Sequence, residues 1–467
     1  MLLSFPLLAQ QPAIEDYCAT DHLSAEQEAF LQDFRQHPDR FAEGERSTRY
    51  VPVQVHIVGQ DNGSGYYPVE DVLRNMCEVN DWYKDANIHF YIKDPINYID
   101  KSVYFNHSGA QGRSMMNIYN VPNRLNWYIV NDPAGTCGYF SPFGDAVALR
   151  KSCLGPGNTT LAHEFGHFLS LPHTFNGWEG GRPPTQFIER ADGSNCQTAG
   201  DGFCDTPADY LADRWTCPYN GNVLIDPVGD TVIPDGTQIM SYSNDACQTS
   251  FSNSQNNAMR AFIATNRSNL VNQGSPATIP ATQSPNLISP TDNAAAIPAN
   301  QVTLEWQSLP SANLYHVEVS RISAFALHEF NNVTTSTSIT VPDLLPGRTY
   351  YWRVTAMNTG NTCTRLSSGT FSFATTEPTG IGPTEVLKGV KVYPNPAQQG
   401  APLLVDLSTY PLLDGAMQLY SMDGRLVHQE VIGGNYLSIP TGKLAQGVYQ
   451  LRITSVEGQY TQRVVIQ

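Results

Sequence analysis

The segment from His163 to His173, which reads HEFGHFLSLPH, constrains this chain more than any other feature. Residues four apart lie on one face of a helix, so His163 and His167 can place two imidazole nitrogens on one metal ion. Glu164 is rotated off that face, where a carboxylate can reach a water in an open coordination position and take its proton. The segment therefore predicts a zinc-bearing helix with a general base beside its first ligand.

The third histidine of the segment requires a turn. His173 cannot lie on the same straight helix and still reach the metal, so the chain must leave the helix after about Leu169. Pro172 supports this break, because it biases the residue before it toward an extended conformation. Three imidazoles leave tetrahedral zinc one open position for water, whose pKa the metal lowers. The predicted zinc ligands are His163, His167 and His173.

The HExxHxxxxxH spacing resembles the metzincin clan of zinc proteases, whose fuller pattern has glycine at the position of Ser170. Glycine is favoured there because the turn needs a positive φ, which costs another residue roughly 1–2 kcal/mol. We therefore expect Ser170 to be strained or the helix end to be altered. The resemblance also implies a methionine turn under the metal at Met240. Tyr242 is placed as in metzincins whose tyrosine hydroxyl helps to hold the tetrahedral intermediate.

Further segments narrow the resemblance to the pappalysin family, in particular its compact microbial branch. They are residues 126–131, 145–150, 173–175, 205–207 and 240–242, and the resemblance covers roughly residues 50–270. Members of that family are zinc endopeptidases, often with calcium near the active-site cleft. The resemblance therefore implies the same activity, the same metal and a candidate calcium site.

Charge and cysteines limit the partners and the compartment. A formal net charge of -16 argues against nucleic acid or an anionic membrane as a partner. Four of the nine cysteines, Cys196, Cys204, Cys217 and Cys247, cluster without a CxxC pair, which favours disulfides over a second zinc site and leaves three connectivities open. The family resemblance suggests the pairs Cys204–Cys247 and Cys196–Cys217. Cys137 and Cys153 are a further candidate pair, and disulfides imply an oxidising compartment.

The N-terminal residues resemble an export signal followed by a pro-segment. Residues 2–9 are a short apolar run without a basic region before it, so residues 1–9 are predicted to be a partial signal peptide. Residues 10–49 form the predicted pro-segment, with a helix at about 24–36 opened by a Ser24–Gln27 capping box. Cys18 is a candidate latency switch, because its thiolate can occupy the fourth zinc position; otherwise it is an unpaired or disulfide-bonded cysteine. Arg46 and Arg49 mark a candidate maturation site.

Residues 50–273 form the predicted catalytic domain. Residues 51–58 alternate as a half-buried strand does, a helical pattern follows from about residue 69, and further strands are expected before the zinc helix. A strand at the cleft edge would pair with an extended peptide. The long loop between His173 and Met240 is rich in Gly, Asp, Asn and Pro. Its calcium candidates are Asp192, Asp201 and Asp205, unless they are solvated turn acids.

Two β domains are expected after the protease domain. A linker rich in Pro, Ser and Thr occupies residues 274–290, and residues 285–376 contain alternating strands and a stretch at 344–350 that resembles the tyrosine corner of fibronectin type III domains. This domain has a binding role or is a spacer. After a second linker at 377–388, residues 388–467 resemble the C-terminal sorting domain of type IX secretion cargo. No apolar stretch reaches the about 18 residues that a membrane span needs.

The sequence thus predicts a multidomain chain, with an α+β metzincin-like zinc protease domain followed by two all-β sandwich domains. The predicted function is a secreted or surface-attached zinc endopeptidase, a monomer, that acts on proteins or peptides and is exported by the type IX machinery. The alternative is a surface-binding protein with a vestigial protease domain. The intact Glu164 argues against it. A zinc hydrolase of non-peptide bonds is a lesser alternative, distinguished by whether the cleft has an edge strand.

Overall fold

The computed structural model describes residues 16–20, 23–41, 47–142, 144–342, 344–376, 387, 389–409, 415–422, 425–455 and 458–467. The chain divides into two compact units, residues 1–375 and 376–467. The predicted signal peptide at residues 1–9, the candidate cleavage residue Arg46 and most of the predicted second linker lie outside the described residues.

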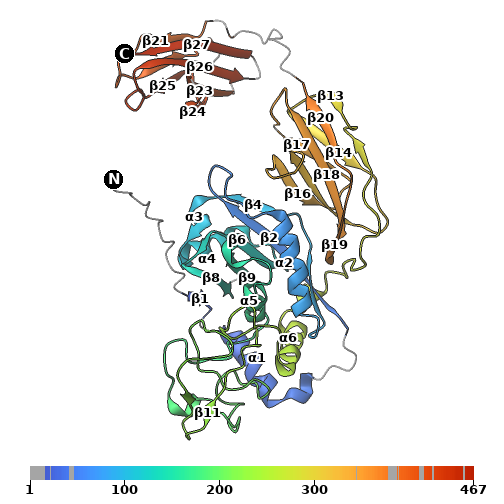
Figure 1. Cartoon of the computed structure of the whole chain (residues 1–467). Coiled ribbons are helices and arrows are strands. Elements are labelled where there is room, and N and C mark those ends of the chain that lie inside the picture. Colours follow the sequence, from blue (N-terminus) through green and yellow to red (C-terminus); the bar gives the residue numbers. More distant parts are fainter. Residues whose placement is uncertain are drawn as a thin grey trace, which may run out of the picture. The chain divides into compact units, whose positions relative to one another are not determined.

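A mainly parallel sheet forms the centre of the first unit (Figure 1). The order is β1-β8-β9-β6-β2-β3, with β4 also paired to β2. Strand β8 runs antiparallel to β9 and forms the edge of the catalytic part of the sheet, to which β1 of the N-terminal segment adds in parallel. The strands are β1 (Asp16–Cys18), β2 (Arg49–Gly59), β3 (Ile88–Ile92), β4 (Asn97–Asp100), β6 (Leu125–Val130), β8 (Thr136–Ser141) and β9 (Ala146–Arg150).

Different helices cover the two faces of this sheet. One face packs against α2 (Val69–Trp82), α5 (Thr160–Phe168) and α6 (Asn253–Asn266), and the other against α3 (Ser102–Phe105) and α4 (Gly109–Tyr119). Adjacent residues of β6 serve both cores, because side chains alternate along a strand: Trp127 lies in the first core and Tyr128 in the second. The zinc helix predicted from the sequence is α5, which is therefore held on a buried sheet face. The short elements are α7 (Ser268–Val271), β5 (Asn106–His107), β7 (Asp132–Pro133), β10 (Leu224–Ile225) and β11 (Thr231–Val232).

The N-terminal segment carries the predicted helix as α1 (Ala25–Gln36). Ser24 caps it, and Gln27 completes the capping box that the sequence predicts. Phe30, Leu31 and Phe34 point into the core of the catalytic domain, and the Phe30 ring lies 5.0 Å from that of Phe262 on α6. The apolar face of α1 thus packs against this domain.

The fibronectin-like domain is a sandwich of two sheets, ordered β12-β14-β17 and β13-β20-β18-β15-β16, with β19 paired to β18. The Tyr350 hydroxyl accepts a hydrogen bond from the Leu345 amide at 2.8 Å, which is the tyrosine corner that the sequence predicts. The strands are β12 (Leu287–Ser289), β13 (Ala294–Ile297), β14 (Gln301–Trp306), β15 (Leu314–Ser320), β16 (Phe330–Thr334), β17 (Ser338–Pro342), β18 (Thr349–Asn358), β19 (Asn361–Ser367) and β20 (Phe371–Thr375).

This domain is tied to the catalytic domain within one compact unit. A disulfide joins Cys77 of α2 to Cys363 of β19. Leu314, Val333 and Met357 of the sandwich belong to the same apolar cluster as the catalytic core. The predicted linker at residues 274–290 lies against the sandwich, where its carbonyl oxygens accept bonds from the turn at residues 360–361. The domain is therefore packed on α2 and covalently linked to it.

The second unit is also a β sandwich, with sheets β21-β22-β25 and β24-β23-β26-β27. Both sheets contribute to one apolar core, which includes Val405, Leu419 and Ile453. The strands are β21 (Lys391–Tyr393), β22 (Leu403–Asp406), β23 (Gly415–Ser421), β24 (Leu426–Val431), β25 (Tyr436–Ile439), β26 (Gly447–Ser455) and β27 (Gly458–Ile466). The predicted order, an α+β domain followed by two β sandwiches, is confirmed.

Candidate active site

Three histidines from α5 and the turn after it meet at one point. The Nε2 atom of His167 lies 3.1 Å from the Nε2 atoms of both His163 and His173. Each Nδ1 faces an acceptor: His163 donates to the carbonyl oxygen of Ile239 and His167 to that of Leu171, both at 2.8 Å. His173 donates to a carboxylate oxygen of Glu179 at 3.0 Å. These bonds leave the three Nε2 lone pairs facing one another, which is the donor set that tetrahedral zinc takes.

The turn at Ser170 has the strained backbone that the sequence predicts. Helix α5 ends at Phe168, and Ser170 has φ 76°, in the left-handed region that favours glycine. The Ser170 amide donates to the His167 carbonyl at 3.0 Å, which closes the turn and directs the chain back toward the metal position. His173 therefore reaches the other two histidines by leaving the helix.

Glu164 lies on α5 beside the histidines and is fully buried. Burial raises the pKa of this carboxyl to about 8, and hydrogen bonds from Cys18 and Thr20 oppose that shift. The Glu164 carboxylate is packed closely against β8, because a Cβ on Gly138 of that strand would lie 2.9 Å from Oε1 of Glu164. Glycine at this point lets the edge strand pass close to the carboxylate.

Met240 and Tyr242 lie where the resemblance implies, Met240 under α5 and Tyr242 beside the histidine rings. Met240 is fully buried under α5, and a Cβ on Gly166 would lie 2.5 Å from its sulfur. The ring of Tyr242 lies 5.0 Å from that of His173 and 5.9 Å from that of His163, measured between centroids. The structure thus brings together all six residues that the sequence assigned to the centre of the site: His163, Glu164, His167, His173, Met240 and Tyr242.

Comparison with known proteins identifies the family. The model of the family described as Pregnancy-associated plasma protein-A matches residues 145–264. An extracellular metalloprotease of Verticillium alfalfae is 33% identical over 239 residues, which are 45% of this chain and 76% of that protein. The chain belongs to the pappalysin family of metalloproteases. Two more extracellular metalloproteases are similar: one of Podospora anserina (26% identical, 47% of this chain, 75% of the relative) and one of Colletotrichum graminicola (23% identical, 56% and 95%).

The C-terminal unit is also identified. Residues 391–467 match the model of the secretion system C-terminal sorting domain. The predicted export by type IX secretion is thereby confirmed for this metalloprotease. No helix within the described ranges is long and apolar enough to cross a membrane.

The N-terminal segment of this pappalysin covers the site. Strand β1 pairs with β8, and the Ala19 amide donates to the Gly138 carbonyl at 3.0 Å. The buried Cys18 has its sulfur within 4.8 Å of one ring nitrogen of each of the three histidines. Its carbonyl accepts a hydrogen bond from the Tyr242 hydroxyl at 3.1 Å, and the Thr20 hydroxyl donates to Glu164 at 3.4 Å. Glu164 and Tyr242 therefore both bond the stretch 18–20, and the three histidines lie beside it.

The structure separates the three calcium candidates. Asp192 is exposed and bonds the Ser194 amide, and Asp205 accepts bonds from the residues that begin α6. Asp201 is fully buried and lies near the buried Glu189, one of whose oxygens has no hydrogen-bond partner in the described part of the chain. Burial, and then the charge of Asp201, raise the pKa of Glu189 to about 9. Of the three candidates, Asp201 is thus the one that is buried with a second carboxylate, that of Glu189, nearby.

The disulfide prediction is right for one pair and wrong for two. Cys137–Cys153 is present. The predicted pairs Cys204–Cys247 and Cys196–Cys217 are not, because the chain turns back after Cys196 and brings its Cα to 5.1 Å from that of Cys204, and these two are bonded. The thiols of Cys217 and Cys247 contact each other without a bond, and with Cys18 they are the cysteines outside disulfides.

The contacts that four side chains make at or near the site were not predicted from the sequence. These side chains are Glu179, which orients His173, Glu189 beside Asp201, and Thr20 and Gln27 of the N-terminal segment. Gln27 donates from its side chain to the His167 carbonyl at 2.7 Å. Glu179 lies six residues after His173, so a search for a carboxylate that fixes the third ring could have found it. Nothing local marks the other three.

Proposed function

We propose that this pappalysin is a secreted zinc endopeptidase of the metzincin type, with Glu164 as its general base. The observation that carries the proposal is the meeting of three Nε2 atoms, 3.1 Å from neighbour to neighbour, beside a buried carboxylate. Zinc bound there supplies a Lewis acid that polarises the peptide carbonyl and lowers the pKa of water. Imidazoles with one nitrogen already fixed by an acceptor favour that metal.

Side chains around the metal position carry out proton transfer and stabilise the developing negative charge, and strand β8 binds the substrate. Glu164 takes a proton from the attacking water and passes it to the leaving amide nitrogen. The Tyr242 hydroxyl donates a hydrogen bond to the oxygen on which negative charge develops, once it is released from the Cys18 carbonyl. Once β1 has left, the edge of β8 is open, and an extended polypeptide binds along it as an added strand. This edge argues for peptide bonds over the other bonds that a zinc hydrolase cuts.

The N-terminal segment keeps the enzyme latent. Its strand β1 takes the edge of β8, and the Cys18 sulfur is the fourth ligand atom near the three histidines. A thiolate is a good zinc ligand and would fill the position that water needs. The same residues bond Glu164 and Tyr242, so removal of the segment frees both groups together.

A calcium ion orders the loop beside the cleft through Asp201 and Glu189. Two buried carboxylates in proximity repel each other unless a cation or protons intervene. Hard oxygen ligands suit calcium better than zinc. The site lies in the loop between His173 and Met240, as the family resemblance implies.

The proposed activity is tested with the chain after removal of its N-terminal segment, on an unstructured protein such as casein. We expect cleavage that stops with a zinc chelator and returns with added Zn²⁺. Glu164→Gln should retain wild-type zinc content by elemental analysis but lose about 10²–10⁴-fold in rate, the usual contribution of a general acid–base group. Glu179→Gln is the matched control of the same chemical change nearby, and it should lose less.

Two results would contradict the proposal. A zinc-loaded wild-type enzyme that cuts no unstructured protein would favour the surface-binding alternative. A Glu164→Gln variant as active as the wild type would show that the base is a different group.

A further inference from the structure

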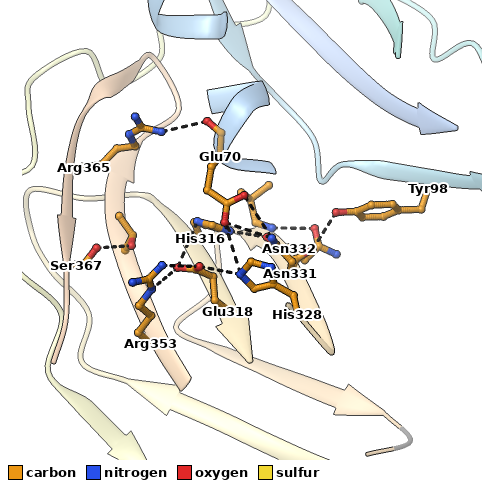
Figure 2. Close-up of polar contacts among 12 residues, drawn as sticks. Glu70, Tyr98, His316, Glu318, His328, Asn331, Asn332, Arg353, Arg365 and Ser367 are labelled. Atoms are coloured by element: carbon orange, nitrogen blue, oxygen red, sulfur yellow. Dashed lines mark hydrogen bonds and ion pairs between the residues drawn. The ribbon is translucent and has the colours of Figure 1, made fainter. Parts of the chain in front are cut away.

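A second group of metal-ligating side chains lies where the fibronectin-like domain meets α2, away from the active site (Figure 2). Glu70 belongs to the first turn of α2. His316 and Glu318 are two residues apart on β15, so they point to the same side of the sheet. His328 comes from the connection to β16. Two imidazoles and two carboxylates from two domains thus converge, and none of them has a role in the proposed reaction.

The distances in this group, which we call the interface cluster, are close to those of a tetrahedral site. Oε1 of Glu70 lies 3.8 Å from Nε2 of both His316 and His328. His328 Nε2 lies 3.0 Å from Oε1 of Glu318, and His316 Nδ1 lies 4.0 Å from its Oε2. Ligands about 2.0 Å from a tetrahedral zinc stand roughly 3.3 Å from one another. One ligand atom each from Glu70, His316 and Glu318 lies within 4.8 Å of the other two, and His328 Nε2 lies near both carboxylates. Side-chain rotations that shorten these separations by about 0.5–1.5 Å would therefore bring the four residues to the spacing of a tetrahedral site.

Burial and charge favour a cation there. The side chains of His316 and Glu318 are 3% and 2% exposed, and Glu70 adds a second carboxylate over them. Arg353 donates to both oxygens of Glu318, at 2.6 and 2.7 Å, and among the described residues it is the one guanidinium bonded to these carboxylates. Two carboxylates against one guanidinium need a second positive charge, because buried negative charge is costly without a partner. A proton on His328, which lies 3.0 Å from Glu318 and 3.8 Å from Glu70, supplies it in the metal-free cluster, and a zinc ion would take the place of that proton. Arg353 approaches Glu318 from the side away from Glu70, which leaves lone pairs for a metal (Figure 2).

One present contact would have to give way. The ring of His316 donates from Nε2 to Oδ1 of Asn331 at 2.6 Å, and the amide of Asn331 also donates to Glu70 at 3.3 Å. The Asn331 side chain therefore now bridges the two groups that a metal would bridge. Rotation of Asn331, together with a shift of the His316 ring proton from Nε2 to Nδ1, would free the Nε2 lone pair for a metal and turn the Nδ1 proton toward Glu318.

We propose that Glu70, His316, Glu318 and His328 form a second, structural zinc site that fastens the fibronectin-like domain to α2. Two nitrogen and two carboxylate oxygen ligands suit zinc, whereas calcium takes oxygen alone. Four protein ligands leave no open position, so the site has no catalytic role. Together with the disulfide between Cys77 and Cys363, it would close the interface at two points on α2.

The test counts zinc in the full-length protein, by elemental analysis after dialysis against metal-free buffer. We expect two zinc ions per wild-type chain. Glu70→Gln and His316→Ala should each lower the count to one, His167→Ala should also lower it to one, and His316→Ala with His167→Ala to none. His428→Ala, in the C-terminal unit, is the control and should leave two. Glu70→Gln preserves size and changes a half-exposed side chain, so it keeps the test independent of folding.

A spectroscopic readout separates the two sites. In His167→Ala the remaining site is loaded with Co²⁺, and we expect the visible bands of tetrahedral cobalt, which Glu70→Gln should abolish. One zinc in the wild type that Glu70→Gln leaves unchanged would overturn the proposal and leave the cluster as a network of ion pairs. Two zinc ions in the wild type and still two in both Glu70→Gln and His316→Ala would equally overturn it, because the second ion would then lie elsewhere.

Discussion

The N-terminal segment and the fibronectin-like domain both pack on the catalytic domain, but they are attached in different ways. The segment contacts the site by hydrogen bonds, by one short parallel strand and by the apolar face of α1. The fibronectin-like domain shares an apolar cluster with the catalytic core and is joined to α2 by a disulfide. One attachment can be released by a single cut in the chain, and the other cannot.

This difference suits the role proposed for each part. A latency segment must leave the edge strand β8 when the enzyme is activated. Its contacts must therefore hold it in place while it is part of the chain, but bind it weakly enough that it dissociates once the chain is cut. Of the candidate cleavage residues, Arg49 already belongs to β2 and its amide donates to the Asn87 carbonyl at 2.8 Å. A cut before Arg49 therefore frees the segment without opening the sheet. The fibronectin-like domain, by contrast, supports α2, whose following residue Tyr83 donates its hydroxyl to the Ala162 carbonyl of α5 at 2.7 Å.

The largest effect is expected from removing the covalent part of this second attachment. The disulfide between Cys77 and Cys363 spans 286 residues, and cross-linking a loop of that length stabilises by about 5–6 kcal/mol in the chain-entropy model. Replacing both cysteines by alanine should therefore lower the melting temperature of the processed enzyme by roughly 10 °C or more, measured by calorimetry.

The matched control is the alanine pair at Cys196 and Cys204, which spans 8 residues. The same model gives about 2–3 kcal/mol for it. If the longer disulfide contributed no more than the shorter one, the fibronectin-like domain would be held by its apolar contacts alone, and the two attachments would be of one kind.

The next effect concerns the segment. Cys18→Ala in the unprocessed chain removes the proposed fourth ligand but leaves β1 on β8 and Thr20 on Glu164. We expect the initial rate on casein to rise about tenfold over the unprocessed wild type, which corresponds to about 1.4 kcal/mol. Intact mass must show that no cut has occurred. Cys217→Ala is the control, and it should leave the rate unchanged.

A different outcome would revise the account of latency. If unprocessed Cys18→Ala stayed as inactive as the wild type, strand pairing and steric cover would suffice for latency. The sulfur near the three histidines would then be a by-product of the path that β1 takes along the sheet.

Helix α5 and the turn after it could be predicted from the sequence because the information for them is local. The spacing of His163 and His167 fixes their common face, and the need for a third ligand fixes the turn at Ser170. The capping box of α1 and the tyrosine corner were predictable for the same reason, since each involves residues within five positions of one another.

The parts that were missed depend on contacts between distant segments. Asp192, Asp201 and Asp205 look alike in sequence, and only the folded loop buries one of them and places Glu189 nearby. Cysteine pairing within the loop depended on turns that no spacing rule specifies. Likewise, Cys77 and Cys363 meet only because the sandwich packs on α2.

The smallest expected effect concerns the strained turn at Ser170, which contacts the N-terminal segment and leads the chain to His173. Ser170 has φ 76°, which costs a non-glycine residue roughly 1–2 kcal/mol, and its hydroxyl donates to the Gln27 carbonyl of the N-terminal segment at a long 3.4 Å. Ser170→Gly relieves the strain in either form but loses that contact only when the segment is present. We therefore expect the free energy of unfolding to rise by about 1 kcal/mol in the processed enzyme and by less in the unprocessed chain.

Urea unfolding of both forms measures this difference, and Ser170→Ala is the control. Alanine keeps the strain and loses the hydroxyl, so it should stabilise neither form and should slightly destabilise the unprocessed one. Equal gains for Ser170→Gly in the two forms would mean that the hydroxyl contributes nothing to holding the segment. A loss of stability in the processed enzyme would mean that the turn needs the serine side chain. Serine in place of glycine would then be required in this chain to position His173.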